Sequence, residues 1–152
     1  MDESPQFIRI EIPASTHYLV LVRQFISSLA HEIGFMSGDV AKIELALDEA
    51  CSNSIRAIRE VEGDCPRTRL QLQVETDKRR LAITVRDNGN DFSHHFNSEI
   101  ALDDLVGNMR TSGYGLRIIK TCMDEVLYEH QPGLGNLLRL VKYVGRSCQE
   151  LG

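Results

Sequence analysis

Apolar and polar positions alternate at the start of the chain, within residues 7–12, where Ile8, Ile10 and Ile12 are separated by Arg9 and Glu11. This two-residue period is typical of a β-strand with one buried face. Over residues 19–33 the apolar spacing changes to three and four residues, the period of an amphipathic helix. Ser15 is a candidate N-cap for that helix, and Gly34 is a candidate C-cap. The first segment is therefore predicted to be a strand followed by a helix.

A second and longer apolar stripe with helical spacing runs from Val40 to Val61, and Ser37 or Asp39 could cap its start. The Gly-Asp-Cys-Pro sequence at 63–66 is a strong loop signal that ends this helix. Alternation returns at 70–74 and again at 81–85. These two segments are predicted to form a β-hairpin.

Periodicity is lost between residues 91 and 112, which predicts a long loop with a short helix inside it. An amphipathic helix follows, with Leu116, Ile119 and Met123 on one side, and strands are expected at 126–129 and 138–143. The order is β-α-α-β-β-loop-α-β-β. Such an order predicts an α+β fold, a two-layer sandwich in which helices cover one face of a mixed, mostly antiparallel sheet.

The composition excludes several functional classes. A length of 152 residues suits one domain, expected to span 1–152 with its core at about 6–143. The net charge of −5 argues against direct nucleic-acid binding, which favours a positive face. No apolar run is long enough to cross a membrane, and the acidic N-terminus does not resemble a signal peptide. We therefore expect a cytoplasmic protein with reduced cysteines.

Three short segments carry candidate chemistry, and the first lies on the long helix. Glu49, Asn53 and Arg56 fall on one side of this helix, opposite the apolar stripe. This side could be no more than a solvated face. Alternatively, Glu49 handles a proton or water while the Asn53 amide oxygen ligates a hard cation such as Mg²⁺, which prefers oxygen ligands.

The second segment, Asp87-Asn88-Gly89, follows a predicted strand. It could be a simple turn, because these residue types favour turns whatever the function. It could also be a site in which Asp87 accepts a hydrogen bond from an exocyclic amine and Gly89 lets a flat ring approach the backbone.

The third segment, residues 112–116 (Ser-Gly-Tyr-Gly-Leu), opens a helix. Free N–H groups at a helix N-terminus favour anions, so glycines there can cradle phosphates. The segment lacks the lysine of a P-loop and the full dinucleotide-binding fingerprint. It is weak evidence when taken alone.

Together and in this order, the three segments resemble the boxes of the GHKL ATPase superfamily, whose nucleotide pocket is the Bergerat fold. Glu-Ala-Cys-Ser-Asn at 49–53 resembles the asparagine box, and Val-Arg-Asp-Asn-Gly at 85–89 resembles the first glycine box. Gly-Tyr-Gly-Leu at 113–116 resembles the second glycine box, and the loop at about 91–112 corresponds to the ATP lid. Within the superfamily, the chain is most similar to the single-domain serine-protein kinases that act as bacterial anti-sigma factors.

The resemblance implies roles for the first two boxes. Glu49 would be the general base or the carboxylate that positions a hydroxyl. Asn53 would coordinate Mg²⁺, and Arg56 would face the phosphates. Asp87 would bind the adenine amino group, and Gly89 would shape the adenine pocket.

The resemblance also implies roles for the lid and the second glycine box. Arg110 would stabilise charge on the γ-phosphate. Ser112, Gly113, Gly115 and Leu116 would supply backbone N–H groups to the phosphates. ATP and Mg²⁺ are the implied cofactors.

By this resemblance the chain is an ATP-dependent serine/threonine protein kinase that phosphorylates a STAS-type anti-anti-sigma protein, sequesters a sigma factor or another regulator, and forms a homodimer. The alternatives are a nucleotide-regulated protein-binding module with little kinase activity and, less favoured, an ATPase fragment of a larger sensor. The chain departs from the family pattern at Ala57, Asn90 and Asn136, where relatives often carry His or Tyr, Gly and Thr, respectively.

Overall fold

The computed structural model describes residues 4–91 and 112–145. Its elements, in chain order, are β1 (Gln6–Pro13), the 3₁₀ turn η1 (Thr16–Tyr18), α1 (Leu19–Ile33), α2 (Ser37–Glu62), β2 (Arg69–Asp77), β3 (Arg80–Asp87), α5 (Ser112–Cys122), β4 (Glu125–Gln131) and β5 (Gly135–Tyr143). Every predicted strand and helix outside 91–112 is present. The loop and short helix expected at 91–112 lie almost entirely outside the described residues.

The five strands form one sheet in the order β1-β2-β3-β5-β4. All four neighbouring pairs are antiparallel, so the expected α+β sandwich is confirmed while its sheet contains no parallel pair among the described strands. β3 and β4 run in the same direction, because each is antiparallel to β5. The β4–β5 hairpin inserts β5 between them, so that they never pair.

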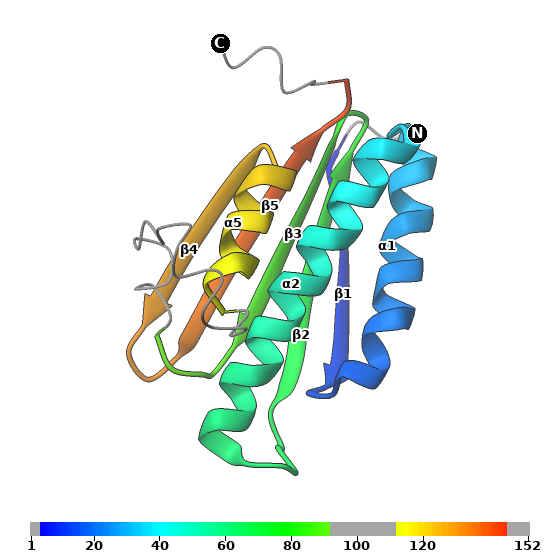
Figure 1. Ribbon diagram of the computed structural model, residues 1–152. Coiled ribbons are helices and arrows are strands. Elements are labelled where there is room, and N and C mark those ends of the chain that lie inside the picture. Colours follow the sequence, from blue (N-terminus) through cyan, green and yellow to red (C-terminus); the bar gives the residue numbers. More distant parts are fainter. Residues whose placement is uncertain (1–3, 92–111, 146–152) are drawn as a thin grey trace.

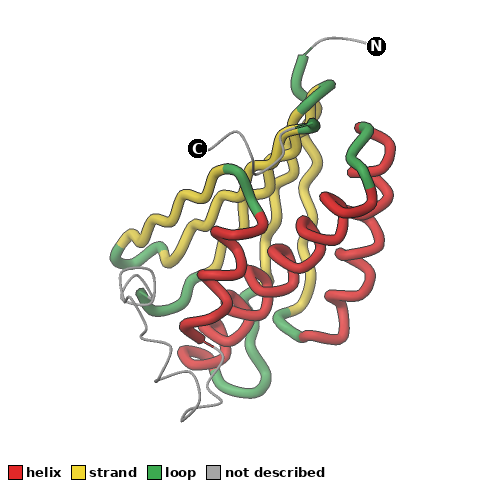
Figure 2. The backbone as a smooth tube through the Cα atoms, turned by 45° about the horizontal axis from the view of Figure 1, so that its top comes forward, coloured by secondary structure: helices red, strands yellow, loops and turns green. Residues whose placement is uncertain are grey.

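Helices α1, α2 and α5 all pack on the same face of this sheet, with α2 across its middle (Figure 1), and the turned view shows helices and sheet as two layers (Figure 2). The core lies between the layers. Its fully buried large side chains include Ile43, Leu47, Leu72, Ile83 and Leu140. The opposite face of the sheet, here called the open face, is not covered by any described helix.

The residues at the helix ends determine where each helix begins and ends. Gly34 ends α1 in the left-handed conformation, with φ of 112°, as its position in the sequence predicted. Ser15 caps η1 instead of α1, because the chain makes one 3₁₀ turn before the helix begins. Met36 occupies the N-cap position of α2, so neither Ser37 nor Asp39 caps it. Val61, at the end of the predicted stripe, is half exposed where α2 extends past the sheet.

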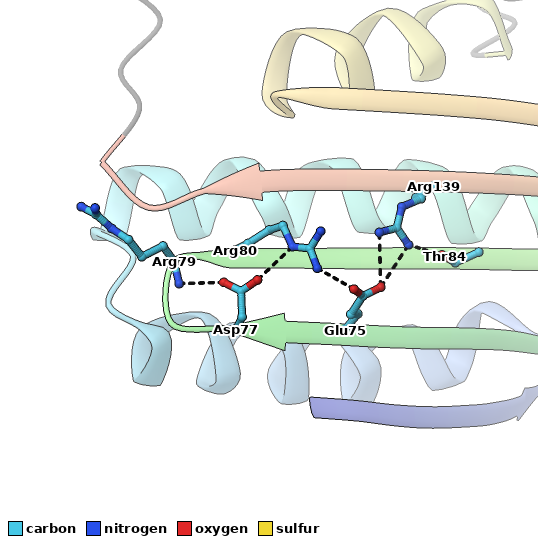
Figure 3. A network of polar contacts seen from close by, with 6 residues as sticks. All are labelled: Glu75, Asp77, Arg79, Arg80, Thr84 and Arg139. Atoms are coloured by element: carbon cyan, nitrogen blue, oxygen red, sulfur yellow. Dashed lines mark hydrogen bonds and ion pairs between the residues drawn. The ribbon is translucent and has the colours of Figure 1, made fainter. Parts of the chain in front are cut away.

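The open face carries a polar network in place of a core (Figure 3). The Glu75 carboxylate accepts hydrogen bonds from Arg80 on the adjacent strand β3 and from Arg139 on β5, one strand further away. Asp77 forms an ion pair with Arg80 at 3.2 Å. Opposite charges on adjacent strands stabilise a sheet locally, so these arginines are compensated by their own neighbours.

No helix in the described part of the chain is long and apolar enough to span a membrane. Among the described residues, Cys51, Cys65 and Cys122 form no disulfide bond, and Cys148 lies outside the described residues.

Candidate functional site

The candidate site begins on α2, at a position where the sequence interpretation was partly wrong. Glu49 and Asn53 were expected opposite the buried stripe, yet Asn53 is only 9% exposed. Helix α2 is buried on two sides, because α5 packs against it as well as the sheet. The second side is lined by alanines such as Ala46 and Ala50, which are fully buried but too small to be noticed as an apolar stripe.

The first turn of α5 lies directly against this side of α2. A Cβ atom built on Gly115 would lie 2.5 Å from Glu49 Oε2 and 3.2 Å from Asn53 Nδ2. A larger residue at position 115 would have to displace the Glu49 carboxylate, so the glycine lets this carboxylate lie against the first turn of α5. The asparagine box and the second glycine box are therefore adjacent in the fold, although more than sixty residues separate them in the chain.

The Asn53 amide is oriented by two neighbours. Arg56, exposed on the next turn of α2, donates a long hydrogen bond of 3.4 Å from Nη1 to Asn53 Oδ1. The Nδ2 atom points toward Gly115. The amide oxygen, which is the atom able to ligate a hard cation, thus faces the same side as the Arg56 guanidinium.

Asp87 ends β3 and points to the helix side of the sheet, where it is 6% exposed. Its Oδ1 atom accepts hydrogen bonds from the Gly89 backbone N–H and from Asn136 Nδ2, both at 2.8 Å. Its Oδ2 atom is buried and has no hydrogen-bond partner among the described residues. The buried Ser54 hydroxyl nearby also lacks such a partner. The carboxylate therefore keeps one fixed acceptor free beside a free hydroxyl.

Burial raises the pKa of Asp87, and it outweighs the nearby Ser54 hydroxyl, the Asn136 amide and the Gly89 N–H, which favour the ionised form. A buried acceptor without a donor is unfavourable, so an incoming N–H donor would satisfy it. The exocyclic amine of adenine is a donor of this kind. The environment of Asp87 thus fits the role that the sequence predicted for it.

Gly89 has a packing reason to be glycine, beside the role that is predicted for it at the adenine pocket. A Cβ atom there would lie 2.4 Å from the Cβ of Ala57 on α2, so the loop after β3 rests directly on the helix. The small side chain of Ala57, one of the departures from the family pattern, permits this contact. Gly89 shapes the site by letting α2 and β3 approach each other.

From the sequence, Asn136 was noted only as a departure from the family pattern. In the structure, its side chain organises one end of the site. Its Nδ2 atom donates to Asp87 and, at 2.9 Å, to the Asn90 carbonyl, while its Oδ1 atom accepts from Tyr128 and contacts His130 Nδ1 at 2.9 Å. Because Nδ2 lies between two acceptors, the amide orientation is determined and His130 must donate from Nδ1. The network depends on the β3–β5 and β4–β5 registers, which sequence periodicity does not specify.

Gly135 is a second residue that was not assigned to the site from the sequence. It joins the turn to β5 and has a φ of +101°. A Cβ atom there would lie 2.0 Å from the Asp87 carbonyl oxygen and 2.5 Å from the Asn88 Cα atom. The turn is therefore folded tightly onto the end of β3 that carries Asp87. A glycine after Pro-Gly-Leu was read only as a turn residue, since nothing local reveals this long-range contact.

The remaining predicted residues are placed less completely. Ser112 and Gly113 begin α5, as expected for a glycine segment at a helix N-terminus. Leu116 lies in the next turn, with its side chain in the core at 2% exposure. Arg110 lies outside the described residues.

The arrangement fits a nucleotide with magnesium. Asp87 Oδ2 offers an acceptor to an adenine amine, and the helix N-terminus of α5 offers N–H groups to anions near Glu49 and Asn53. No group of three or more acidic, histidine or cysteine side chains that could hold a metal ion occurs in the described part of the chain. Asn53 would therefore hold Mg²⁺ together with phosphate oxygens and water, a mode this ion accepts.

Several curated proteins are similar to the whole chain. The serine-protein kinase RsbW of Bacillus cereus (strain AH820) is 29% identical over 155 residues, covering 99% of this chain and 92% of the relative. RsbW of Bacillus anthracis matches at the same level, and RsbW of Bacillus thuringiensis (strain Al Hakam) is 28% identical.

Solved structures share the fold at lower identity. The RsbU and RsbW domains of Rv1364c from Mycobacterium tuberculosis match with a TM-score of 0.66 and 17% identity, over 93% of this chain and 33% of that longer one. A chain of the SiaB-SiaC complex from Pseudomonas aeruginosa matches with a TM-score of 0.65 and 12% identity, over 88% of each chain.

A family model described as "Histidine kinase-like ATPase domain" matches residues 12–142, which include every box described above and nearly all of the core. The expected superfamily is therefore confirmed: the chain belongs to the family of histidine kinase-like ATPase domains.

Proposed function

We propose that the protein is an ATP- and Mg²⁺-dependent serine/threonine protein kinase of the anti-sigma type. The observation that carries this proposal is the proximity of Glu49 and Asn53 to Gly115: a carboxylate and an amide side chain lie beside the helix N-terminus that would receive phosphates. The similarity to RsbW serine-protein kinases over nearly the whole chain supports the same reaction.

In this reaction ATP supplies the phosphoryl group, and the residues of the chain position the reactants and neutralise charge. Asp87 binds the adenine amine, and Asn53 holds Mg²⁺. Backbone N–H groups of Ser112, Gly113, Gly115 and Leu116 bind phosphate oxygens. Glu49 accepts or orients the proton of the attacking hydroxyl, a task in which carboxylates are effective. Phosphoryl transfer depends mostly on such positioning and charge neutralisation.

The remaining assignments follow from the same family. Arg56 and Arg110 contribute positive charge toward the phosphates. The acceptor is a serine or threonine hydroxyl of a STAS-type antagonist protein, and a sigma factor or another regulator is the sequestered partner. The SiaB neighbour was solved in complex with SiaC, which supports a partner-binding role for this fold. We propose a homodimer in the cytoplasm as the working state.

Nucleotide binding can be tested by thermal unfolding of the full chain with ATP and Mg²⁺. A ligand at about 100 times its Kd adds about 2.7 kcal/mol to the free energy of unfolding, so Tm should rise by roughly 5–10 °C. Asp87→Asn and Asn53→Ala should each abolish most of this rise, whereas Arg9→Gln, on the open face, should leave it intact. A folded protein without any rise at millimolar ATP would contradict the proposal.

Asp87→Asn should not destabilise the protein without nucleotide. The raised pKa of Asp87 means that the folded state holds its proton more tightly than the unfolded state, so the ionised carboxylate opposes folding above that pKa. The neutral amide keeps an acceptor for Gly89 and Asn136 and can donate to Ser54. Urea unfolding at about pH 7 should show equal or greater stability for Asp87→Asn, and the difference should shrink at about pH 4.5. A large loss of stability at pH 7 would contradict this account.

A further inference from the structure

A second cavity, of about 280 Å³, lies on the open face of the sheet. Side chains that line it include Arg69, Gln71, Arg86, Glu129, Leu134 and Leu137. Four of these residues form one row across the sheet, in which Gln71 pairs with Arg86, Arg86 with Leu137, and Leu137 with Glu129. Asp87, Asn88, Gly135 and Asn136 also border this cavity, so it adjoins the candidate nucleotide site, but the Asp87 side chain points to the opposite face of the sheet.

The walls of the cavity are held in place by contacts within the chain. Asn88 Nδ2 donates to Thr68 Oγ1 at 2.8 Å and to Glu62 Oε2 at 3.2 Å. Glu62 Oε1 in turn accepts from the backbone N–H groups of Arg67 and Thr68. On the other side, the Gly135 turn is folded onto Asn88. The cavity therefore exists before any ligand binds, as most small-molecule sites do.

The arginines of the open face differ in whether a carboxylate pairs with them. Arg80 and Arg139 form ion pairs with carboxylates of β2 (Figure 3). The side chains of Arg69 and Arg86, which line the cavity, form no ion pair or hydrogen bond with any residue that the structure describes. The chain has five more acidic than basic residues, so it does not lack carboxylates that could have compensated them.

We propose that this cavity binds a small anionic molecule with an apolar body, such as a carboxylate or a phosphate monoester. Arg69 and Arg86 come from adjacent strands and would hold the anionic group, since guanidinium groups bind carboxylate and phosphate through paired hydrogen bonds. Leu134 and Leu137 would contact the apolar body. Glu129, beyond Leu137 in the row, disfavours a second anionic group at the far end. The volume is at the low end for small-molecule pockets, so the ligand is of about the size of one substituted ring.

The proposal is tested by nuclear magnetic resonance titration of the ¹⁵N-labelled full chain with phenyl phosphate, and in parallel with benzoate. We expect saturable shifts at the backbone amides of Arg86 and Leu137 for at least one probe. The probe that binds more tightly identifies the anionic group. Inorganic phosphate and benzyl alcohol, which each lack one half of the expected ligand, should bind more weakly.

Matched variants distinguish specific binding in the cavity from nonspecific attraction of the anionic probe to positive charge. Arg69→Gln and Arg86→Gln should each weaken binding by about tenfold or more, and Arg86→Lys should restore only part of it. Arg9→Gln removes a charge from the same face outside the cavity and should have no effect. The amide spectra also show that each variant is folded. Linear shifts without saturation, equal losses in Arg9→Gln, or shifts confined to Gly115 at the nucleotide site would each overturn the proposal.

Discussion

Glu49→Gln should remove phosphoryl transfer while leaving ATP binding in place. The substitution keeps the size of the side chain against Gly115 but removes the carboxylate that would accept the proton of the attacking hydroxyl. General acid–base catalysis contributes about 10²–10⁴-fold to rate, so transfer to a cognate STAS-type protein should fall by at least about 100-fold. The rise in Tm with ATP and Mg²⁺ should remain close to that of the unsubstituted protein.

The matched control is Glu60→Gln, because Glu60 is an exposed carboxylate in the last turn of the same helix. It should transfer phosphate at the normal rate. Undiminished transfer in Glu49→Gln would show that Glu49 is not the base. Failure of the unsubstituted protein to transfer phosphate, together with intact ATP and partner binding, would favour the nucleotide-regulated binding module.

The largest loss of stability is expected for Gly135→Ala. The added methyl group would lie 2.0 Å from the Asp87 carbonyl oxygen, and the residue would keep a φ of +101°, which alanine rarely adopts. Backbone strain of this kind costs of order 1–3 kcal/mol, and relieving the overlap requires the end of β3 to move. We expect a total of roughly 3–5 kcal/mol and a decrease in Tm of roughly 6–20 °C.

The variant Gly133→Ala, in the same turn, separates the effect of backbone strain from the effect of steric overlap. Gly133 has a φ of +82°, but a Cβ atom there meets nothing within 4 Å. It should therefore show the strain alone, about 1 kcal/mol. Because Gly135 also positions Asp87, Gly135→Ala should lose the ATP-dependent rise in Tm, whereas Gly133→Ala should keep it. Equal losses of stability in both variants would show that the overlap with β3 is relieved without cost.

The fold was largely predictable because its strands and helices follow their periods closely. Alternation located β1, β2 and β3, and the three-to-four spacing located α1 and α2. The sequence order also suggested that the strands pair in hairpins. What periodicity could not predict was the position of β5 between β3 and β4, since strand order depends on tertiary packing. The sheet was expected to be mixed and mostly antiparallel, and all four described pairs are antiparallel because β5 separates β3 from β4.

The candidate site was predictable where chemistry lies in short motifs. Asp87, Glu49 and Asn53 were identified from the boxes, and the structure brings Glu49 and Asn53 against Gly115. The residues that hold them were missed. Asn136 acts across 49 positions to reach Asp87, and such a contact leaves no local signal. The buried second side of α2 was missed because alanines are only weakly hydrophobic and do not stand out as an apolar stripe. Their small side chains nevertheless allow helices to pack closely.

The pairing of β1 with β2 has a consequence for how the protein is made. Pro13 of β1 pairs with Arg69 of β2, so the first strand must wait for two whole helices to be synthesised before its partner exists. At about 5–20 residues per second, that wait lasts roughly 3–11 seconds on the ribosome. During this time the backbone N–H and C=O groups of β1 that pair with β2 have no native partner. This strand therefore remains open to pairing with the wrong strand until β2 has been made.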